Sequence, residues 1–470
     1  MRENLMANAG NLQQSLPYRN LGLSGRMTYS FSNRYFAEFN FGYNGSERFH
    51  KKNRFGFFPS AGIAWNISNE KFWEPYKSTI TGLKLRTSYG LVGNDAIGSA
   101  ADRFFYLSIV NMDDGGKTAT FGENQNSYRR NGVTVNRYSN EDITWEISEK
   151  RNVALEIGIW DKVNIIAEYF EEYRKNILMD RANIPNTLGL SSTIRANVGE
   201  ASGRGTDISA EYQQIWQNEI WLTMMGNFTY ATSKYEVFEE PTYEEPWRYR
   251  AGKPLSQEFG YIAEKLFIDD AEVENSPKQF GDYGAGDIKY LDVNRDGNIT
   301  EADRVPIGNP TTPEIVYGFG FSLGYRNLDI SSFFQGLANE SFWINVATTS
   351  PFNNETQLLK AYADSYWSEE NRNIYAVWPR LSPTVNANNN QTSTWFMRDG
   401  SFIRLKQLEL GYTLPEDFQK RLGTSTLRFY LSGTNLFILS KFKMWDAEMG
   451  GNGLGYPLQK TFNFGLNVSF

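Results

Sequence analysis

A run of oxygen-bearing side chains between residues 292 and 303 has the spacing of a calcium-binding loop. Hard divalent cations take several oxygen ligands at alternate positions of such a loop, and a glycine near its middle permits the sharp turn. In "DVNRDGNITEAD" this glycine is Gly297, and the candidate ligands are Asp292, Asn294, Asp296, Asn298, Thr300 and Asp303. The spacing therefore predicts a structural calcium ion. The alternative is a polar turn that its own aspartate and asparagine side chains stabilise without a metal.

Catalytic chemistry has few candidate groups in this chain. Its 470 residues include no cysteine and one histidine, His50, so thiol nucleophiles, disulfides and two-histidine zinc sites are excluded. A Ser–His hydrolase would have to use His50, which lies in the basic segment "ERFHKKNRFG", where we expect a solvated hairpin tip. We predict no catalytic residues. The net charge of -7 also argues against nucleic-acid binding.

Several tryptophans fall between the predicted strands. A flat ring with one N–H donor could stack on a sugar or contact a partner protein, and packing within a loop is the alternative. These candidate contact residues are Trp247, Trp343, Trp367, Trp378 and Trp395. The segment 357–371 has apolar residues at helical spacing, so we expect an amphipathic helix there.

Strands must position these groups, because the 33 Phe, 27 Tyr and 12 Trp residues lie largely at alternate positions. Within 35–44, for example, Tyr35, Phe39 and Tyr43 share one parity, and Glu38 and Asn40 share the other. Side chains with a period of two lie on opposite faces of a strand. The runs are longer than the ~5–6 residues of soluble strands and match the ~9–11 that cross a bilayer. This pattern predicts an all-β, antiparallel transmembrane barrel, and a soluble β-sandwich is the alternative.

The connections between these strands alternate between short and long, as in outer-membrane barrels with short periplasmic turns and long outer loops. We predict thirteen spanning strands, the first over 18–31 and the last over 458–470. The predicted outer loops are approximately 94–140, 175–203, 233–313, 339–401 and 440–457. Single-chain bacterial barrels have an even number of strands, and residues 1–11 lack the pattern of a signal peptide. We therefore expect residues 1–470 to be the C-terminal part of a larger barrel.

Several segments, taken in order, resemble SusC/RagA-type TonB-dependent receptors of Bacteroidetes. They are "FFPSAGIAWNIS" (57–68), "LKLRTSYGLVGN" (83–94), "YGFGFSLGYRNLDISSFFQG" (317–336), "GSFIRLKQLELGYTLP" (400–415), "LRFYLSGTNLF" (427–437) and "YPLQKTFNFGLNVSF" (456–470). The resemblance implies the last ~13 strands of a 22-stranded barrel whose plug and TonB box are absent from this chain. The terminal run is similar to the signal that the barrel assembly machinery reads, with Phe462, Phe464, Leu466, Val468 and Phe470 on one parity.

The resemblance also implies a function. We expect import of oligosaccharides, glycans or peptides across the outer membrane of a Gram-negative bacterium of the Bacteroidetes type. The implied partners are a SusD-like lipoprotein, the TonB complex acting through the missing front part, and the surrounding lipid and lipopolysaccharide. A secreted, calcium-binding, β-rich adhesin and a barrel hydrolase are the alternatives.

Overall fold

The computed structural model describes residues 2–4, 18–98, 104–122, 128–353 and 356–470. Its main feature is one antiparallel sheet of 14 strands, in the order β1-β2-β3-β4-β5-β8-β9-β10-β11-β16-β17-β20-β21-β22. β1 (Arg2–Asn4) is a short edge piece on β2, so the thirteen long strands that the alternation predicts are confirmed. The long strands are β2 (Tyr18–Phe31), β3 (Tyr35–Ser46), β4 (Phe55–Asn66), β5 (Ile80–Asn94), β8 (Glu146–Ile159), β9 (Val163–Asp180), β10 (Arg195–Ile215), β11 (Ile220–Val237), β16 (Ile315–Tyr325), β17 (Leu328–Ala338), β20 (Phe402–Thr413), β21 (Thr426–Ser440) and β22 (Thr461–Ser469).

The register of the sheet places apolar residues opposite apolar residues on one face and polar residues opposite polar residues on the other. Met27 lies opposite Phe39, and in the next row Thr28 lies opposite Glu38. Because directly opposed residues share a face, the apolar parity of each strand continues that of its neighbour. The sheet therefore has one largely apolar face and one polar face.

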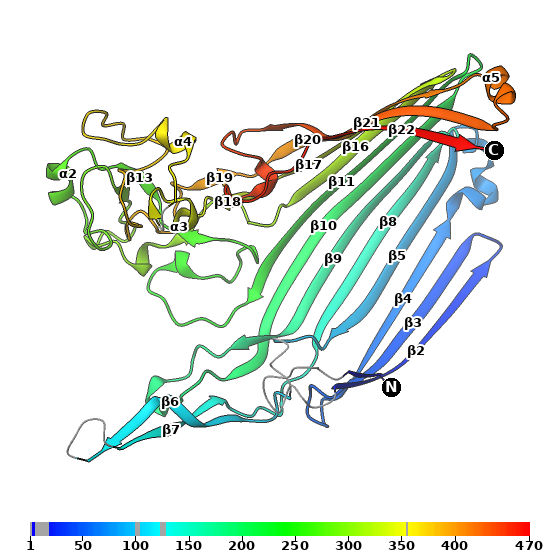
Figure 1. Ribbon diagram of the computed structural model, residues 1–470. Helices are drawn as coiled ribbons and strands as arrows, with labels where there is room; N and C mark the ends of the chain where they lie inside the picture. The colour runs from blue at the N-terminus through cyan, green and yellow to red at the C-terminus, as the bar shows by residue number, and fades with distance from the viewer. Residues whose placement is uncertain (1, 5–17, 99–103, 123–127, 354–355) are drawn as a thin grey trace.

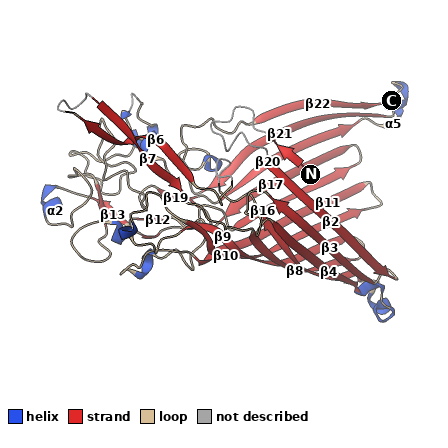
Figure 2. Cartoon of the chain, turned by 90° about the horizontal axis from the view of Figure 1, so that it is seen from below, coloured by secondary structure: helices blue, strands red, loops and turns tan. Residues whose placement is uncertain are grey.

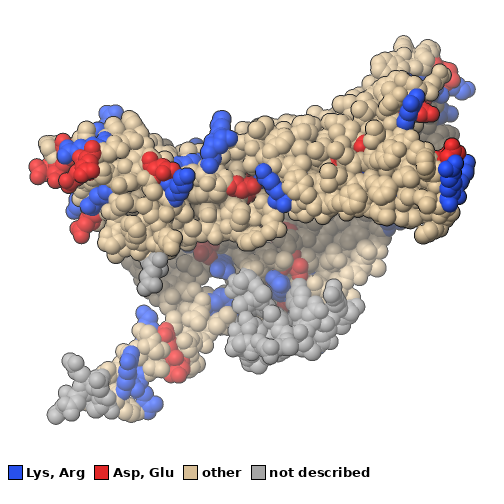
Figure 3. All heavy atoms as spheres, turned by 45° about the horizontal axis from the view of Figure 1, so that its top comes forward, with Lys and Arg blue, Asp and Glu red and all other residues tan. Residues whose placement is uncertain are grey.

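The sheet curves around a hollow (Figures 1 and 3) and is open, because β1 and β22 at its ends do not pair with each other within the described residues. Short connections gather at one end of the strands, and long ones gather at the other (Figures 1 and 2). We call these the short-turn end and the long-loop end. The connections alternate as the sequence predicts, except that a short hairpin joins β3 to β4 at the long-loop end.

The long connections carry structure of their own. β6 (Ile109–Phe121) and β7 (Tyr128–Arg137) form a hairpin that projects from the long-loop end (Figure 1). Three small two-stranded sheets pair β12 (Phe259–Gly260) with β15 (Val305–Pro306), β13 (Ala263–Leu266) with β14 (Ile288–Tyr290), and β18 (Ser341–Trp343) with β19 (Met397–Asp399). The segments 238–314, 339–401 and 441–460 fold together, and we call them the loop lobe.

Helices are short and lie in the connections. The α-helices are α2 (Asp270–Glu274), α3 (Val346–Thr349), α4 (Lys360–Ala363) and α5 (Glu416–Arg421). The 3₁₀ helices are η1 (Ile67–Asn69), η2 (Lys71–Tyr76), η3 (Asn186–Leu188), η4 (Pro246–Arg248), η5 (Glu301–Asp303) and η7 (Ala447–Met449). None of the helices in the described ranges has the length and apolar content needed to cross a bilayer.

Two expectations from the sequence need correction. β9, β10 and β11 extend further toward the long-loop end than the alternation indicates, so the predicted loop 175–203 shrinks to 181–194. The helix expected over 357–371 is only the four-residue α4. Beyond it the chain turns to pair with a later segment, since Trp367 and Trp378 are joined by a backbone hydrogen bond of 3.1 Å.

Candidate functional site

The outward, apolar face of the sheet has the character of a lipid-contacting surface. Met27, Ile63 and Phe464 on this face are 69%, 63% and 76% exposed. Exposing such side chains to water costs about 25 cal/mol of free energy per Å² of apolar surface, and contact with acyl chains removes this cost. Figure 3 shows few charged side chains across the middle of the strands and more at their ends and on the loop lobe.

Aromatic and large apolar side chains gather at the short-turn end. They are exposed and lie in the short connections or at the strand ends that adjoin them, as in the interfacial girdle of a membrane barrel. They include Phe31, Tyr35, Phe72, Tyr76, Trp160, Trp216, Tyr325 and Phe418. The face and the girdle together identify a membrane-spanning sheet.

The inward face carries paired charges. On β5, Lys84 Nζ and Arg86 Nε lie 3.2 and 3.0 Å from the carboxylate of Glu156 on β8. Arg86 also reaches Glu168 on β9 at 2.8 Å, so one network crosses three neighbouring strands. A second network joins Arg428 on β21 to Asp329 on β17 and Glu409 on β20, at 2.6 and 2.7 Å. Charges of this kind belong beside water, which indicates that this face lines an aqueous interior.

The loop lobe has its own hydrophobic core, which packs against the long-loop end of β17, β20 and β21 through Leu337, Phe402 and Ile438. The core residues come from all three segments of the lobe and are almost completely buried. They include Tyr261, Leu266, Ile288, Tyr290, Ile299, Phe342, Ile344, Tyr362, Trp367, Trp378, Phe396, Phe442 and Ala447. Because a core of this kind fixes the segments that form it, the lobe is a folded body rather than three separate loops.

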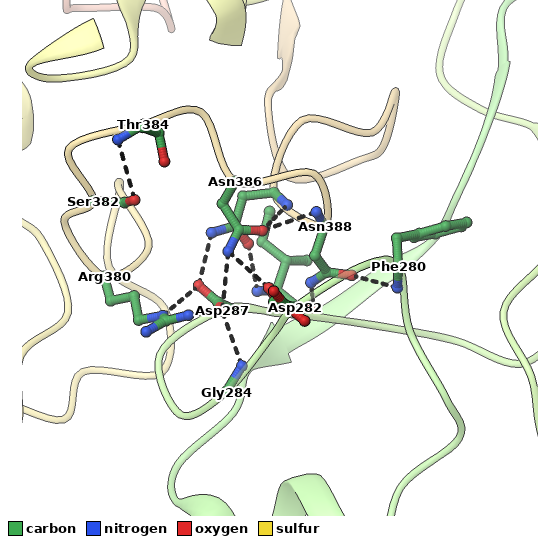
Figure 4. Close-up of polar contacts among 11 residues, drawn as sticks. Phe280, Asp282, Gly284, Asp287, Arg380, Ser382, Thr384, Asn386 and Asn388 are labelled. Carbon is green, nitrogen blue, oxygen red and sulfur yellow. Dashed lines mark hydrogen bonds and ion pairs between the residues drawn. The ribbon is translucent and has the colours of Figure 1, made fainter.

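A buried polar centre joins two segments of the lobe (Figure 4). The carboxylate of Asp287 is 0% exposed and forms an ion pair with Arg380 Nη2 at 2.8 Å. It also accepts hydrogen bonds from Gly284 N at 2.9 Å and Asn389 Nδ2 at 2.8 Å. The hydrogen bonds to Asp287 raise the pKa of Arg380, so the guanidinium stays charged. Asn386 Nδ2 lies 3.4 Å from the same carboxylate. This centre connects residues about one hundred positions apart.

Two tyrosines complete the contact between these segments. Tyr290 donates its hydroxyl to the carbonyl of Asn388 at 2.7 Å, and burial raises its pKa well above the ordinary value. Burial, followed by the nearby Glu301 carboxylate, raises the pKa of Tyr261 to about 12. Both hydroxyls therefore stay protonated at neutral pH.

The predicted tryptophan contacts are partly wrong. Trp367 and Trp378 are 5% and 4% exposed in the core of the lobe, so they cannot stack on a ligand. Trp343 and Trp247 donate their indole N–H groups to the carbonyls of Ser393 and Ala302, at 2.8 and 2.9 Å. Trp395 packs against the core. Trp247, Trp343 and Trp395 remain partly exposed, so contact with a ligand or a partner stays a prediction for these three.

The predicted calcium loop brings only some of its ligands together. Asp292, Asn294 and Asp296 face one another, since Asp296 N donates to Asn294 Oδ1 at 3.1 Å and to Asp292 Oδ1 at 3.3 Å. The hydrogen bond from the Asn294 side chain, then that from the Asn298 amide, lowers the pKa of Asp296.

Asp303 has a different environment from these ligands. Its buried carboxylate accepts the amide N–H groups of Val293 and Thr300, both at 2.8 Å, and closes a capping box with Thr300. In the part of the chain that the structure describes, no three acidic or histidine side chains are arranged to hold a metal ion. Asp292, Asn294 and Asp296 thus lie close together, whereas Asp303 closes the loop through backbone amides, and metal binding by these residues, Asn298 and Thr300 stays a prediction.

His50 lies on the hairpin between β3 and β4, as the sequence predicts. Its Nε2 is 3.7 Å from a Glu141 oxygen, and its ring contacts Tyr106 edge to face with centroids 5.7 Å apart. The neighbouring Phe49 and Trp145 belong to a second buried cluster at the long-loop end. His50 therefore contributes to packing between the β3–β4 hairpin and the long connection that carries Tyr106 and Glu141.

The terminal run forms β22, whose partner in the sheet is β21. Phe462 to Val468 at alternate positions are exposed on the outward face, and Phe470 lies immediately after the strand. This arrangement agrees with the parity that the sequence predicts. The role of the run as an assembly signal stays a prediction.

The chain is similar to known proteins in both sequence and structure. No family model matches the chain. TonB-dependent receptor P3 of Formosa agariphila is 27% identical over 95% of this chain and 45% of its own length. TonB-dependent receptor SusC of Bacteroides thetaiotaomicron is 26% identical over 95% of this chain and 43% of its own length. The chain resembles SusC/RagA-type TonB-dependent receptors.

Solved structures agree on the fold. The RagAB peptide transporter superimposes with a TM-score of 0.71 at 21% identity, over 97% of this chain and 48% of its own. The same importer in its 'open-open' state gives a TM-score of 0.73. The chain spans about half the length of these SusC/RagA-type relatives. TonB-dependent receptors are outer-membrane β-barrel proteins, and the spanning sheet places the chain in that membrane.

Sequence reasoning missed the groups that organise the loop lobe. Asp287, Arg380, Asn386 and Asn389 meet only in three dimensions, and the one local signal is the asparagine-rich run at 386–390. The β6–β7 hairpin was also not predicted, because its apolar residues do not continue the alternation of the spanning strands.

Proposed function

We propose that the chain forms about half of the wall and part of the outer mouth of an importer for oligosaccharides, glycans or peptides. The observation that carries this proposal is the sheet with an apolar outward face, a charged inward face and a folded lobe over one end. A polar interior admits hydrated solutes, and the lobe supplies a fixed surface at the entrance. A SusD-like lipoprotein above the lobe and the TonB complex below the sheet are the partners that the RagA and SusC likeness supports.

Uptake by cells tests this proposal. Cells that lose the gene encoding this chain should take up fluorescent oligosaccharides or fluorescent peptides at background rates, and expression of the intact gene should restore one of the two. The substrate that is restored identifies the class. Unchanged uptake of both after deletion would contradict the proposal.

The two alternatives make different predictions. An adhesin would stay in solution without detergent, whereas we expect the chain in the membrane fraction with a folded form that migrates differently before and after boiling. For a hydrolase, the His50→Ala substitution should abolish turnover. We expect no hydrolysis of candidate glycans by either form, and His50-dependent hydrolysis would overturn the assignment.

We also propose a structural calcium ion in the loop 292–303, with Asp292, Asn294 and Asp296 as its side-chain ligands. Its role would be to stabilise a corner of the loop lobe, because Ile299 in the same loop is buried in the lobe core. The three facing side chains and the turn at Gly297, with a φ of 84°, support the proposal.

Substitution of the proposed ligands should weaken calcium binding. Asp292→Ala and Asp296→Ala should each weaken calcium binding by about tenfold or more, because each removes a charged oxygen ligand. Isothermal titration calorimetry measures the change, and Glu301→Ala is the control, because this exposed carboxylate lies in the loop but is not among the proposed ligands. Absence of calcium uptake by the unsubstituted chain would refute the site.

A further inference from the structure

Small side chains form a block on the inward face of β4 and β5. Ser60 and Gly62 on β4 lie directly opposite Gly90 and Ser88 on β5. They share the parity of Arg86, whose ion pairs lie on the inward face, so the block faces the aqueous interior. A pocket of about 740 Å³ lies over this part of the wall, and we call it the wall pocket. Its volume is within the range of ~300–1,000 Å³ that is usual for ligand sites.

Larger side chains of the two adjoining strands form the sides of the wall pocket. On β3, Glu38 and Asn40 continue the two rows of the block. On β8, Asn152 and Lys150 continue the same rows on the other side. Phe36, which is partly exposed, lines the pocket toward the short-turn end. The wall pocket thus combines polar sides with one aromatic side chain.

The charges around the wall pocket are matched by opposite charges. Glu38 forms an ion pair with Arg26 at 2.8 Å. Lys150 lies directly opposite Glu172 on β9. Arg86 is held by its two carboxylate partners on β8 and β9. The pocket therefore presents no unmatched charge to a ligand.

Neutral polar groups supply the hydrogen-bonding capacity of the wall pocket. Asn40 Nδ2 donates to the Glu38 carboxylate at 2.8 Å, and Asn152 Nδ2 donates to the Glu168 carboxylate. These bonds orient both amides and leave their carbonyl oxygens as acceptors. The hydroxyl groups that line the pocket belong to Thr28, Ser30, Ser60 and Ser88. Among the described residues, none of these hydroxyls has a protein hydrogen-bond partner.

We propose that the wall pocket binds a neutral oligosaccharide during its passage through the barrel, an inference that rests on the import function proposed above. A sugar ring has an apolar face of C–H groups, which can pack against Phe36. Its hydroxyls can donate to the amide oxygens of Asn40 and Asn152 and accept from the serine hydroxyls. A peptide with charged ends would leave water without finding an unmatched partner charge in the pocket.

Filling the wall pocket tests this site in cells that carry the intact gene. A Cβ atom at Gly62 would lie 3.5 Å from its nearest neighbours, so the backbone can accept a side chain there. Gly62→Leu should lower the uptake of labelled neutral hexasaccharides of glucose, mannose or xylose by about tenfold. Gly203→Leu is the matched control. Gly203 lies in the same row of the inward face on β10, outside the pocket, and a Cβ there would lie 3.6 Å from its nearest neighbour.

The outcomes separate this inference from the import function. At equal amounts of protein in the outer membrane, unchanged hexasaccharide uptake with Gly62→Leu, or an equal loss with Gly203→Leu, would overturn the wall pocket. Import of labelled hexapeptides alone by the unsubstituted protein would also overturn it and would leave the import function standing. Deletion of the gene without effect on either uptake would contradict import itself.

Thiol labelling gives a second measurement that does not depend on filling the pocket. Residues 1–470 contain no native cysteine, so Ser88→Cys places a single thiol of this chain in the block. A charged, water-soluble methanethiosulfonate should label it, and the imported hexasaccharide, but not a hexapeptide, should slow the labelling by about tenfold. Absence of labelling would mean that another part of the protein fills the pocket. That result, or equal labelling rates with and without the hexasaccharide, would overturn the proposal.

Discussion

Replacing Asp287 by alanine is expected to destabilise the loop lobe by about 3–5 kcal/mol, because several buried donors lose their acceptor at once. Gly284 N and Asn389 Nδ2 both donate to this carboxylate, and an unpaired buried donor costs about 1–3 kcal/mol. Arg380 is 42% exposed, so water can solvate its guanidinium, and its loss of the carboxylate adds less. The residues involved join the segments 238–314 and 339–401, so both should loosen together.

Amide hydrogen exchange measures this effect segment by segment. Asp287→Ala should speed exchange around 284–290 and 386–396 by about two orders of magnitude or more and leave the strands unchanged. Asp282→Ala is the control, since Asp282 is exposed and only its backbone carbonyl contacts Asn386 (Figure 4). Independent exchange of the two segments in the unsubstituted chain would show that the lobe is not one body.

Replacing Phe228 by arginine is expected to cost about 2–4 kcal/mol of stability in a bilayer. Phe228 lies on the outward face of β11, opposite Ile208 and Tyr317, in the apolar band. A charge there would lie in hydrocarbon, whereas the neighbouring Asn227 belongs to the inward face. Asn227→Arg should therefore cost less than about 1 kcal/mol.

Urea titration of the chain folded in phospholipid vesicles compares the two variants. Phe228→Arg should unfold at a clearly lower urea concentration than Asn227→Arg. Equal destabilisation by both substitutions would mean that the two faces do not differ in environment, as in a soluble sheet.

The spanning strands could be predicted from sequence because membrane and lumen impose opposite demands on alternate residues. β2, β17 and β22 carry this alternation over nearly their whole length, and their predicted positions agree with the structure. The sequence pattern did not predict the part of β10 that runs through "VGEASGRGTD". Beyond the membrane neither face of a strand has to be apolar, so the alternation is lost there. Ladder hydrogen bonds extend the strand there without leaving a sequence pattern.

The loop lobe could not be predicted for a different reason. Its elements are short, and its core and polar centre form between residues far apart in sequence, such as Asp287 and Asn389. The helical pattern over 357–371 gave way because Tyr362 and Trp367 are buried against Trp378 and Phe396 in that core. Tertiary packing overrides a local preference of well under 1 kcal/mol per residue.

The alternation in β11 and its neighbours places one face of the sheet in lipid and the other in water. Since the chain contains no native cysteine, single cysteines placed in turn at 222–230 can each carry a spin label. In bilayers we expect accessibility to oxygen to peak at Leu222, Met224 and Phe228, and accessibility to a water-soluble nickel chelate to peak at Thr223, Asn227 and Thr229. The two profiles should alternate with a period of two and in opposite phase. Profiles that rise and fall together, or that show no alternation, would contradict a membrane-spanning sheet.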